Sequence, residues 1–376
     1  MTQASRVTLS SIAIRDFRNI ERAELTIPPD GIALVGDNGQ GKTNFLEAIA
    51  YLELLRSMRG VRDRDLTRFG ATAFHIGCVS AGAAVNRVGI GVERTGKKRI
   101  MLDGVDTPRL TDALGALPSV CFSPADIALI AGAPAERRRY LDIALALSSK
   151  RYLAALRQYR AALARRNAAL REAARPGARH SSVAAWEPAL AEHGAVIVEE
   201  RRGWVAEGAT EFTRLCADIG ERAKMQIEYE SPLAAAADVR AALAEALHKG
   251  RDHDARRMIT HAGPHRDDLA VTLGTRDLRL VGSAGQQRTA AIALRLLEAA
   301  TFRTRGGAQP VLLLDDPFAE LDRKRASRVL ALLEESSATG LGQTILCVPR
   351  EDEIPAAFTR LERWTVRDGV FARVAS

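Results

Sequence analysis

The sequence lacks paired cysteines, long apolar runs and a leader-like beginning. Its four cysteines lie far apart in the 376 residues and form no C-x-x-C pair, which argues against a zinc site and fits a reducing compartment. No apolar run approaches the ~20 residues that span a bilayer. The polar stretch 1–6 has no apolar core of the kind that a signal peptide needs. We therefore expect a cytoplasmic chain without a membrane partner.

The composition is that of a globular protein with more than one part. Hydrophobic residues make up 47% of the chain and charged residues 27%, which excludes a wholly disordered protein. A chain of 376 residues is too long for one ordinary core, so we expect two domains or one domain with a large insertion.

Positive charge is concentrated in one segment. The net charge is +8, yet residues 137–179 alone hold eleven arginines and one lysine against two acidic residues. A basic helical segment of this kind favours a polyanionic partner, and nucleic acid is the obvious one. The alternative is the solvated face of an arginine-rich helix.

A glycine-rich stretch lies between a short apolar run and a helical pattern. Residues 31–35 predict a buried strand, and residues 44–52 place apolar side chains at helical spacing. Strand, G-x-x-x-x-G-K-T and helix together predict a phosphate-binding P-loop. A mere turn with a stray lysine is disfavoured because both flanks fit. The loop comprises Gly36, Asp37, Asn38, Gly39, Gln40, Gly41, Lys42 and Thr43.

Different P-loop residues are expected to contact different parts of the nucleotide. Glycines allow backbone N–H groups to converge on phosphate oxygens, and the helix N-terminus adds positive potential. Lys42 is expected to reach the β- and γ-phosphates of ATP, and the Thr43 hydroxyl to bind Mg²⁺.

A second carboxylate-bearing strand completes the predicted catalytic site. Residues 310–314 form an apolar run that ends in Asp315 and Asp316. We expect Asp315 to contact Mg²⁺ and Asp316 to orient the attacking water. The alternative for Asp316 is a helix cap or a salt-bridge partner. The tripeptide at 320–322, Glu-Leu-Asp, follows in the expected order.

The tetrapeptide S-x-G-Q at a predicted helix start distinguishes among P-loop proteins. It contains Ser283, Gly285 and Gln286 and precedes Asp315 by 32 residues. A helix N-terminus with a hydroxyl and free N–H groups is an anion site. The motif resembles the signature motif of ABC-type ATPases, which implies that it binds the γ-phosphate held by a second subunit's P-loop.

Coarser patterns predict the remaining architecture. Residues 73–102 alternate like antiparallel hairpins. Residues 148–220 are mostly helical, and a Pro-Gly break at 175–178 divides them into an antiparallel helical hairpin. Further strands are expected at 225–230 and 343–348, a helix at 234–248, and a hairpin at 364–374 with its turn at 368–369.

The motifs together resemble the RecF family of the ABC/SMC ATPase superfamily over nearly the whole length. Besides the P-loop, the S-x-G-Q motif and the paired aspartates, the stretches that match are Phe17-Arg18-Asn19, the block from Pro124 to Asp142 with Gly132-Ala133-Pro134 and Arg137-Arg138, and Gly263-Pro264-His265-Arg266-Asp267-Asp268-Leu269.

The resemblance implies an α/β fold, an ABC-type P-loop ATPase head with a mixed sheet, an antiparallel lobe and an inserted helical arm. Its implied parts are the first section of the head at 1–135, a basic arm at 136–255 and the second section of the head at 256–376. It also implies that Arg18 and Asn19 help to bind the nucleotide.

The same resemblance implies a function in recombinational repair. ATP with Mg²⁺ would join two copies of the chain into a homodimeric clamp on double- and single-stranded DNA, acting with RecO and RecR to place RecA at gaps in the SOS response. Weak DNA-dependent ATP hydrolysis would serve this binding. The rival functions are a transporter ATPase subunit, a DNA-bridging SMC protein, or a DNA-binding module with a vestigial nucleotide site.

Three positions depart from the family or superfamily pattern. Ala125 stands where an acidic residue is usual, no glutamine near Phe122 forms a Q-loop, and residues 347–349 hold no switch histidine. His265 is expected to fix a loop or to touch nucleotide or DNA, with a catalytic base as the lesser alternative. Because only His261 lies at ligand spacing from it, no metal is expected there.

Overall fold

The structure is a computed structural model, and it describes residues 5–173, 181–318, 321–335 and 342–374. The chain divides into two compact units. Unit 1 contains Met1–Asp126, Asp218–Gly220 and Leu294–Ser376, and unit 2 contains Ile127–Ala217 and Glu221–Ala293. The three sequence ranges given above for head and arm stay a prediction.

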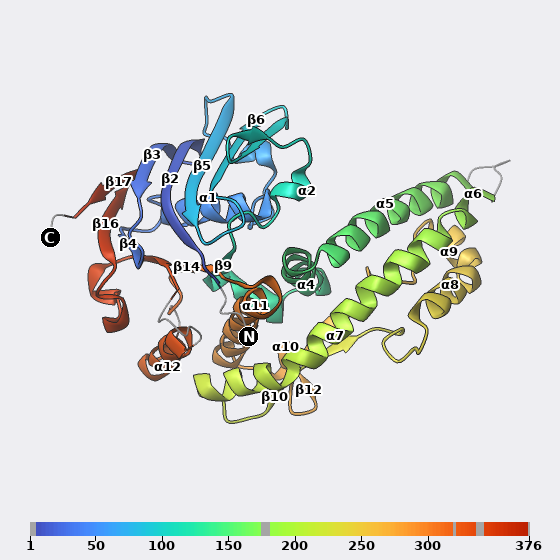
Figure 1. The fold of residues 1–376 in the computed structure, drawn as a ribbon. Helices are drawn as coiled ribbons and strands as arrows, with labels where there is room; N and C mark the ends of the chain where they lie inside the picture. The colour runs from blue at the N-terminus through green and yellow to red at the C-terminus, as the bar shows by residue number, and fades with distance from the viewer. Residues whose placement is uncertain (1–4, 174–180, 319–320, 336–341, 375–376) are drawn as a thin grey trace. The chain divides into compact units, whose positions relative to one another are not determined.

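Unit 1 is built on a six-stranded sheet with the order β17-β16-β4-β15-β14-β9 (Figure 1). Its strands are parallel except for the edge strand β17, which pairs antiparallel with β16. Parallel strands present their carboxyl ends at one edge, where α/β proteins bind ligands. The strands are β4 (Gly31–Val35), β9 (Ser119–Phe122), β14 (Val311–Asp315), β15 (Thr344–Val348), β16 (Glu362–Arg367) and β17 (Val370–Arg373).

A second six-stranded sheet in unit 1 is antiparallel throughout, with the order β3-β2-β5-β6-β7-β8. The hairpins predicted for residues 73–102 are confirmed, because their alternating side chains leave one face of the sheet buried. The strands are β2 (Thr8–Phe17), β3 (Ile20–Thr26), β5 (Ala73–Ala81), β6 (Arg87–Glu93), β7 (Lys98–Leu102) and β8 (Val105–Asp106).

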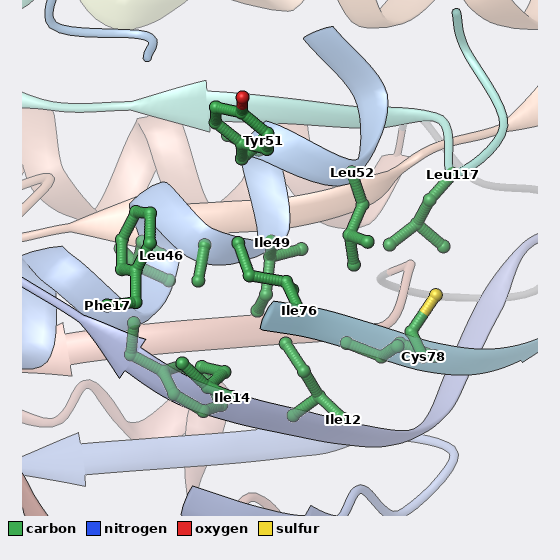
Figure 2. Close-up of a cluster of buried hydrophobic side chains, with 14 of the residues drawn as sticks. Ile12, Ile14, Phe17, Leu46, Ile49, Tyr51, Leu52, Ile76, Cys78 and Leu117 are labelled. Atoms are coloured by element: carbon green, nitrogen blue, oxygen red, sulfur yellow. The ribbon is translucent and has the colours of Figure 1, made fainter. Parts of the chain in front are cut away.

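Helix α1 (Lys42–Leu54) supplies side chains to a core that both sheets share. Figure 2 shows part of this cluster, with side chains of α1, β2 and β5 facing one another. The Phe74 ring meets Phe17 and Tyr51 edge to face, with centroids 5.2 and 5.4 Å apart. This packing fixes the helix whose first turn ends the P-loop.

The shorter elements of unit 1 connect these layers. A two-stranded parallel pair joins the beginning of the described chain to the strand before β14. The elements are β1 (Ser5–Arg6), β13 (Ala308–Gln309), the helices α2 (Leu110–Ala113) and α12 (Arg323–Glu335), and the 3-10 turns Asp63–Asp65, Pro124–Ile127, Glu351–Glu353 and Ala356–Phe358.

Unit 2 contains the predicted pair of long helices, α5 (Lys150–Ala173) and α7 (Glu187–Ile219). Contacts between them run in opposite directions along the chain: Arg151 pairs with Glu199, and Arg166 with Glu187. The expected antiparallel arrangement is therefore confirmed, whereas the turn at 175–178 lies outside the described residues. Within the described ranges, no helix is long and apolar enough to cross a membrane.

The other elements of unit 2 surround this pair. Helix α4 begins at Pro134, where proline suits the first helical position. The strand predicted at 225–230 is confirmed as β10, which pairs with β11. The helix expected from 234 begins only at 239, because the Asp238 side chain caps it by accepting a hydrogen bond from the Ala241 amide. The elements are α3 (Ala128–Ala131), α4 (Pro134–Ser148), α6 (Ser181–Ala184), β10 (Met225–Glu230), α8 (Val239–Lys249), α9 (Arg251–Arg257), β11 (Asp268–Leu273), β12 (Arg276–Asp277), α10 (Leu278–Val281) and α11 (Ala284–Gly306), which continues into unit 1.

A buried ionic network holds α5, α7 and α9 together. The Arg166 side chain is fully buried and donates to Asp254 at 2.7 Å, to Glu187 at 3.2 Å and to the Thr260 hydroxyl at 2.8 Å. Arg251 also donates to Glu187. The two carboxylates therefore balance the charges of the buried Arg166 and the partly exposed Arg251.

Burial gives Glu53 of α1 an unusual protonation state. Its carboxyl oxygens accept hydrogen bonds from the Ser119 amide at 3.0 Å and the Ser119 hydroxyl at 2.8 Å. Desolvation raises the pKa of Glu53 to about 8, although the Ser119 bonds oppose the shift. The native state at neutral pH therefore holds a proton here that the unfolded chain releases.

We predict that Glu53→Gln changes how stability depends on pH. Because folding raises the pKa of Glu53, its contribution to the free energy of unfolding is full below about pH 4.5 and is lost as the pH rises through about 8. Glutamine imitates the protonated acid, so the free energy of unfolding of the variant should rise relative to that of the wild type over this pH range. The difference should be on the order of one kcal/mol per pH unit, and a few kcal/mol in all. Urea unfolding at several pH values measures the difference. Parallel curves for Glu53→Gln and the wild type would contradict the shift.

Candidate functional site

The P-loop lies between β4 and α1, as predicted. Two of its glycines adopt positive φ, Gly39 at 82° and Gly41 at 117°, values that side chains rarely allow. Gly36 has no room for a side chain, since a Cβ there would lie 2.3 Å from the Val366 carbonyl oxygen. The glycines of the motif are therefore required by backbone conformation and by close approach.

Lys42 folds back over the loop at the start of α1. Its ammonium donates hydrogen bonds to the carbonyl oxygens of Asp37, at 2.9 Å, and Gly36. The residue is 7% exposed. A cation held at the mouth of a glycine-rich loop is suited to bind phosphate oxygens in place of these carbonyls.

Thr43 and Asp315 meet although 272 positions separate them. The Thr43 hydroxyl lies 3.0 Å from both carboxylate oxygens of Asp315. Sheet register explains this contact, because Asp315 pairs with Cys347 and Cys347 with Leu34, so that β14 ends at the edge from which the P-loop leaves β4.

The Thr43–Asp315 pair has the chemistry of a magnesium site. Burial raises the pKa of Asp315, while the Thr43 hydroxyl and the Lys42 charge act in the opposite direction. A carboxylate and a hydroxyl at hydrogen-bonding distance are hard oxygen donors, the kind that Mg²⁺ prefers. The residues present therefore fit the ion.

Asp316 follows in an uncommon backbone conformation. Its φ is 44°, in the left-handed region that costs a non-glycine residue of order 1 kcal/mol. Its amide donates to the Cys347 carbonyl at 3.0 Å, which holds it at the same sheet edge. Of the tripeptide that follows, Glu320 lies outside the described residues, and Asp322 caps α12 by accepting from the Arg325 amide.

Arg18 and Asn19 have different partners: Asn19 contacts the P-loop itself, and Arg18 contacts a carboxylate of α1. Asn19 donates to the Gln40 carbonyl at 3.2 Å and accepts from Asn44 at 2.8 Å, so it ties the P-loop to α1. The Arg18 guanidinium forms two bonds, of 3.1 and 3.2 Å, with the buried carboxylate of Glu47. Its expected contact with nucleotide stays a prediction.

Sequence reasoning missed two supports of the loop. Glu47 is fully buried and also accepts from the Ser57 hydroxyl at 2.5 Å. At the β16–β17 turn, the Asp368 and Gly369 amides donate to the side chain and backbone of Gln40. The turn itself is predicted from Asp-Gly, but no local pattern indicates its partner.

The S-x-G-Q motif begins α11. The Ser283 hydroxyl accepts from the Gln286 amide at 3.3 Å, and the Gln286 side chain accepts from the Ser283 amide at 3.0 Å. This reciprocal pair is a capping box. Gln286 also donates to Glu221 at 3.3 Å, and Gly285 accepts from the Thr289 hydroxyl. Ser283 and Gln286 belong to unit 2, whereas the P-loop belongs to unit 1.

Several arginines of the basic segment serve internal contacts. Arg137 forms a bidentate pair with Asp268 at 2.7 and 2.8 Å, and Arg138 donates to the Asp267 carbonyl at 2.8 Å. Arg160 pairs with Asp142 at 2.7 Å. The two family stretches that contain Arg137 and Asp268 thus meet inside unit 2. On α5 the exposed cations include Lys150, Arg157 and Arg171.

His265 fixes a loop to α5. Its Nδ1 lies 2.6 Å from the Tyr159 hydroxyl and its Nε2 lies 2.9 Å from the Thr260 carbonyl. Burial lowers the pKa of His265 to about 4, so the imidazole is neutral at pH 7. Both ring nitrogens are engaged, which supports the loop-fixing alternative over a catalytic base.

Comparisons with known proteins agree with this geometry. A family model described as the RecF/RecN/SMC N terminal domain matches residues 8–366. The DNA replication and repair protein RecF of Roseiflexus castenholzii is 37% identical over 393 aligned positions, covering 96% of this chain and 98% of the relative. RecF of Anaeromyxobacter dehalogenans is 38% identical, covering 98% and 100%. The chain belongs to the RecF family.

As a RecF-family member, the chain is a DNA replication and repair protein. A solved structure described as the recombination mediator protein RecF-ATP in the RecFOR pathway matches 100% of this chain and 99% of its own, with TM-score 0.89 and 27% identity. A second, described as RecF-ATPrS, covers 100% of both chains with TM-score 0.88. A Smc head domain from Pyrococcus furiosus matches 98% of this chain and 96% of its own with TM-score 0.57 and 19% identity, which shows the fold alone. The expected ABC-type ATPase fold is confirmed.

Proposed function

We propose that this chain binds ATP with Mg²⁺ at the P-loop and uses it to close a homodimeric clamp on DNA during recombinational repair. The contact between Thr43 and Asp315 supports the proposal most directly, because it joins the two motifs that a bound Mg²⁺-nucleotide needs. A 27% identical structural neighbour is described as RecF-ATP.

Each residue of the site has a role in this proposal. Lys42 exchanges its bonds with the loop carbonyls for the β- and γ-phosphates, and the loop amides surround the phosphate oxygens. Thr43 and Asp315 hold Mg²⁺. Asp316, held at the same edge, orients the water in a weak DNA-dependent hydrolysis that reopens the clamp.

In this proposal, dimerisation uses the S-x-G-Q motif at the start of α11. The Ser283 hydroxyl accepts the Gln286 amide, so its own proton is not used in that bond and is available to a γ-phosphate from the partner copy. Gly285 lets the backbone approach closely. ATP bound between the P-loop of one copy and Ser283 of the other would hold the two copies together.

The exposed cations of α5 suit a phosphate backbone. Three of these cations are spaced by multiples of seven residues, so they lie along one face of the helix: Lys150, Arg157 and Arg171. Such contacts bind DNA without reading sequence. We further propose a cytoplasmic role with RecO and RecR in delivering RecA to gaps, within the SOS response; a structural neighbour is described as part of the RecFOR pathway.

One titration tests the clamp. We expect ATP to convert the wild type to dimers and to tighten binding to gapped, single- and double-stranded DNA, with an affinity that falls steeply as salt rises. Ser283→Arg should bind ATP normally, remain monomeric and keep the DNA affinity of the ATP-free state, because the larger side chain blocks the trans contact. Light scattering and fluorescence anisotropy measure the two quantities.

The control is Thr210→Arg, which adds the same charge at an exposed position of α7. It should dimerise and bind DNA like the wild type. Normal dimers of Ser283→Arg would refute the trans role of the motif. A wild type that stays monomeric at saturating ATP and Mg²⁺ would refute the clamp itself.

A further inference from the structure

Two histidines and a buried aspartate gather in unit 2, outside the P-loop, the paired aspartates and the S-x-G-Q motif. His253 and Asp254 belong to α9, and His261 lies in the loop that follows it. The His261 Nδ1 is 2.8 Å from Asp254 Oδ1, and the His253 Nδ1 is 4.0 Å from the same oxygen. One ligand atom from each residue lies within 4.8 Å of the other two.

The aspartate is held from behind by the ionic network. Arg166 donates to Asp254 Oδ2 at 2.7 Å, so this oxygen is occupied and Oδ1 is directed at the imidazoles. The His261 amide also donates to Oδ1, at 3.1 Å. Ligating carboxylates in metalloproteins are commonly oriented by such outer hydrogen bonds.

The cluster opens onto a cavity of about 290 Å³, which Asp267 also lines. The side chain of Asp254 is 2% exposed, while those of His253 and His261 are 53% and 38% exposed. The carboxylate is therefore fixed, and the two imidazoles have space to turn. The cavity has room for water as a further ligand.

We propose that His253, Asp254 and His261 bind one divalent transition-metal ion of the zinc class. Two imidazole nitrogens and one carboxylate oxygen suit Zn²⁺, Co²⁺ or Ni²⁺, and three protein ligands leave a position for water. Tetrahedral zinc needs ligand atoms ~3.3 Å apart. The His261 contact has to lengthen slightly and the His253 contact to shorten, which rotation of exposed side chains provides.

The ion would join two segments that local hydrogen bonds already bring together. It would tie α9 to the loop in which His265 contacts Tyr159 and the Thr260 carbonyl. Because the folded chain fixes the Asp254 carboxylate beside both imidazoles, the folded state should bind the ion more tightly than the unfolded chain, and binding stabilises unit 2. This site differs from the magnesium site in chemistry, since Mg²⁺ prefers oxygen donors alone.

The test uses the full chain freed of any polyhistidine tag. Calorimetric titration with Zn²⁺, and the visible absorption of added Co²⁺, should show one tight site in the wild type. His253→Ala and His261→Ala should each weaken Zn²⁺ binding at least tenfold. Zn²⁺ should raise the melting temperature of the wild type but not that of the double variant.

His248→Ala is the matched control, because His248 is an exposed histidine on the adjacent helix α8. It should bind Zn²⁺ and Co²⁺ like the wild type. The variants keep Asp254 and Arg166, so ATP binding and circular dichroism should match the wild type. A wild type that binds Zn²⁺ no more tightly than His253→Ala/His261→Ala would overturn the proposal, as would an equal loss in His248→Ala.

Discussion

Lys42→Ala is expected to weaken ATP binding by at least roughly 30-fold and to abolish ATP-dependent dimers. In the proposed function the Lys42 ammonium binds the β- and γ-phosphates. In the structure it is buried against the loop carbonyls of Gly36 and Asp37. Removing one partner of a desolvated charge pair costs roughly 2–5 kcal/mol, which is about 30- to several-thousand-fold in affinity.

A fluorescent ATP analogue with Mg²⁺ measures the loss, and light scattering measures the dimer. Lys249→Ala is the control, since its ammonium pairs with the exposed Glu245 one turn away on α8. This variant should bind ATP and dimerise normally. Dimers of Lys42→Ala on addition of ATP would show that the nucleotide does not join the two copies through this loop.

Arg166→Ala is expected to lower the free energy of unfolding by about 3–5 kcal/mol, the cost of breaking a buried ion pair by removing one partner. The fully buried guanidinium is bonded to Asp254 and Glu187, and the Thr260 hydroxyl. Alanine would leave Asp254 without the Arg166 guanidinium, while Glu187 would keep its pair with Arg251.

Urea unfolding followed by circular dichroism measures the change. Arg157→Ala, at an exposed position of the same helix, should change stability by no more than about 0.5 kcal/mol. Arg166→Lys retains the charge but not the planar guanidinium, so its free energy of unfolding should lie between those of Arg166→Ala and the wild type. If the free energy of unfolding of Arg166→Ala lay within about 1 kcal/mol of the wild-type value, the network would not hold the helices together.

The P-loop, its flanking strand and helix, and Asp315 could be predicted because their patterns are local. Positive φ at Gly39 and Gly41 is a property of single residues, and the apolar run before Asp315 is long enough to indicate a buried strand. The S-x-G-Q helix start was predicted for the same reason, since a capping box closes within four residues.

The partners of charged residues could not be predicted in this way. Residues 137–179 suggested a polyanion-binding surface, yet Arg137 pairs with Asp268, more than a hundred positions away, and Arg166 is buried among the three helices. Charge is visible in a sequence, but burial depends on which segments pack against it. The contacts of Arg18 with Glu47 and of Gln40 with the Asp368 turn were missed for the same reason.

The amino-acid order alone determined the family, the P-loop, and the two strands β4 and β14 that end at the same sheet edge. Glycine conformation and apolar periodicity act over a few residues, which is why they can be read locally. Only the tertiary structure decided which arginines are neutralised inside unit 2, how the P-loop is supported, and that His253 and His261 meet at Asp254. The physical reason is that these contacts depend on packing. The ion pairs join side chains many positions apart, whereas His253 and His261 meet because the loop after α9 folds back so that the His261 amide donates to Asp254.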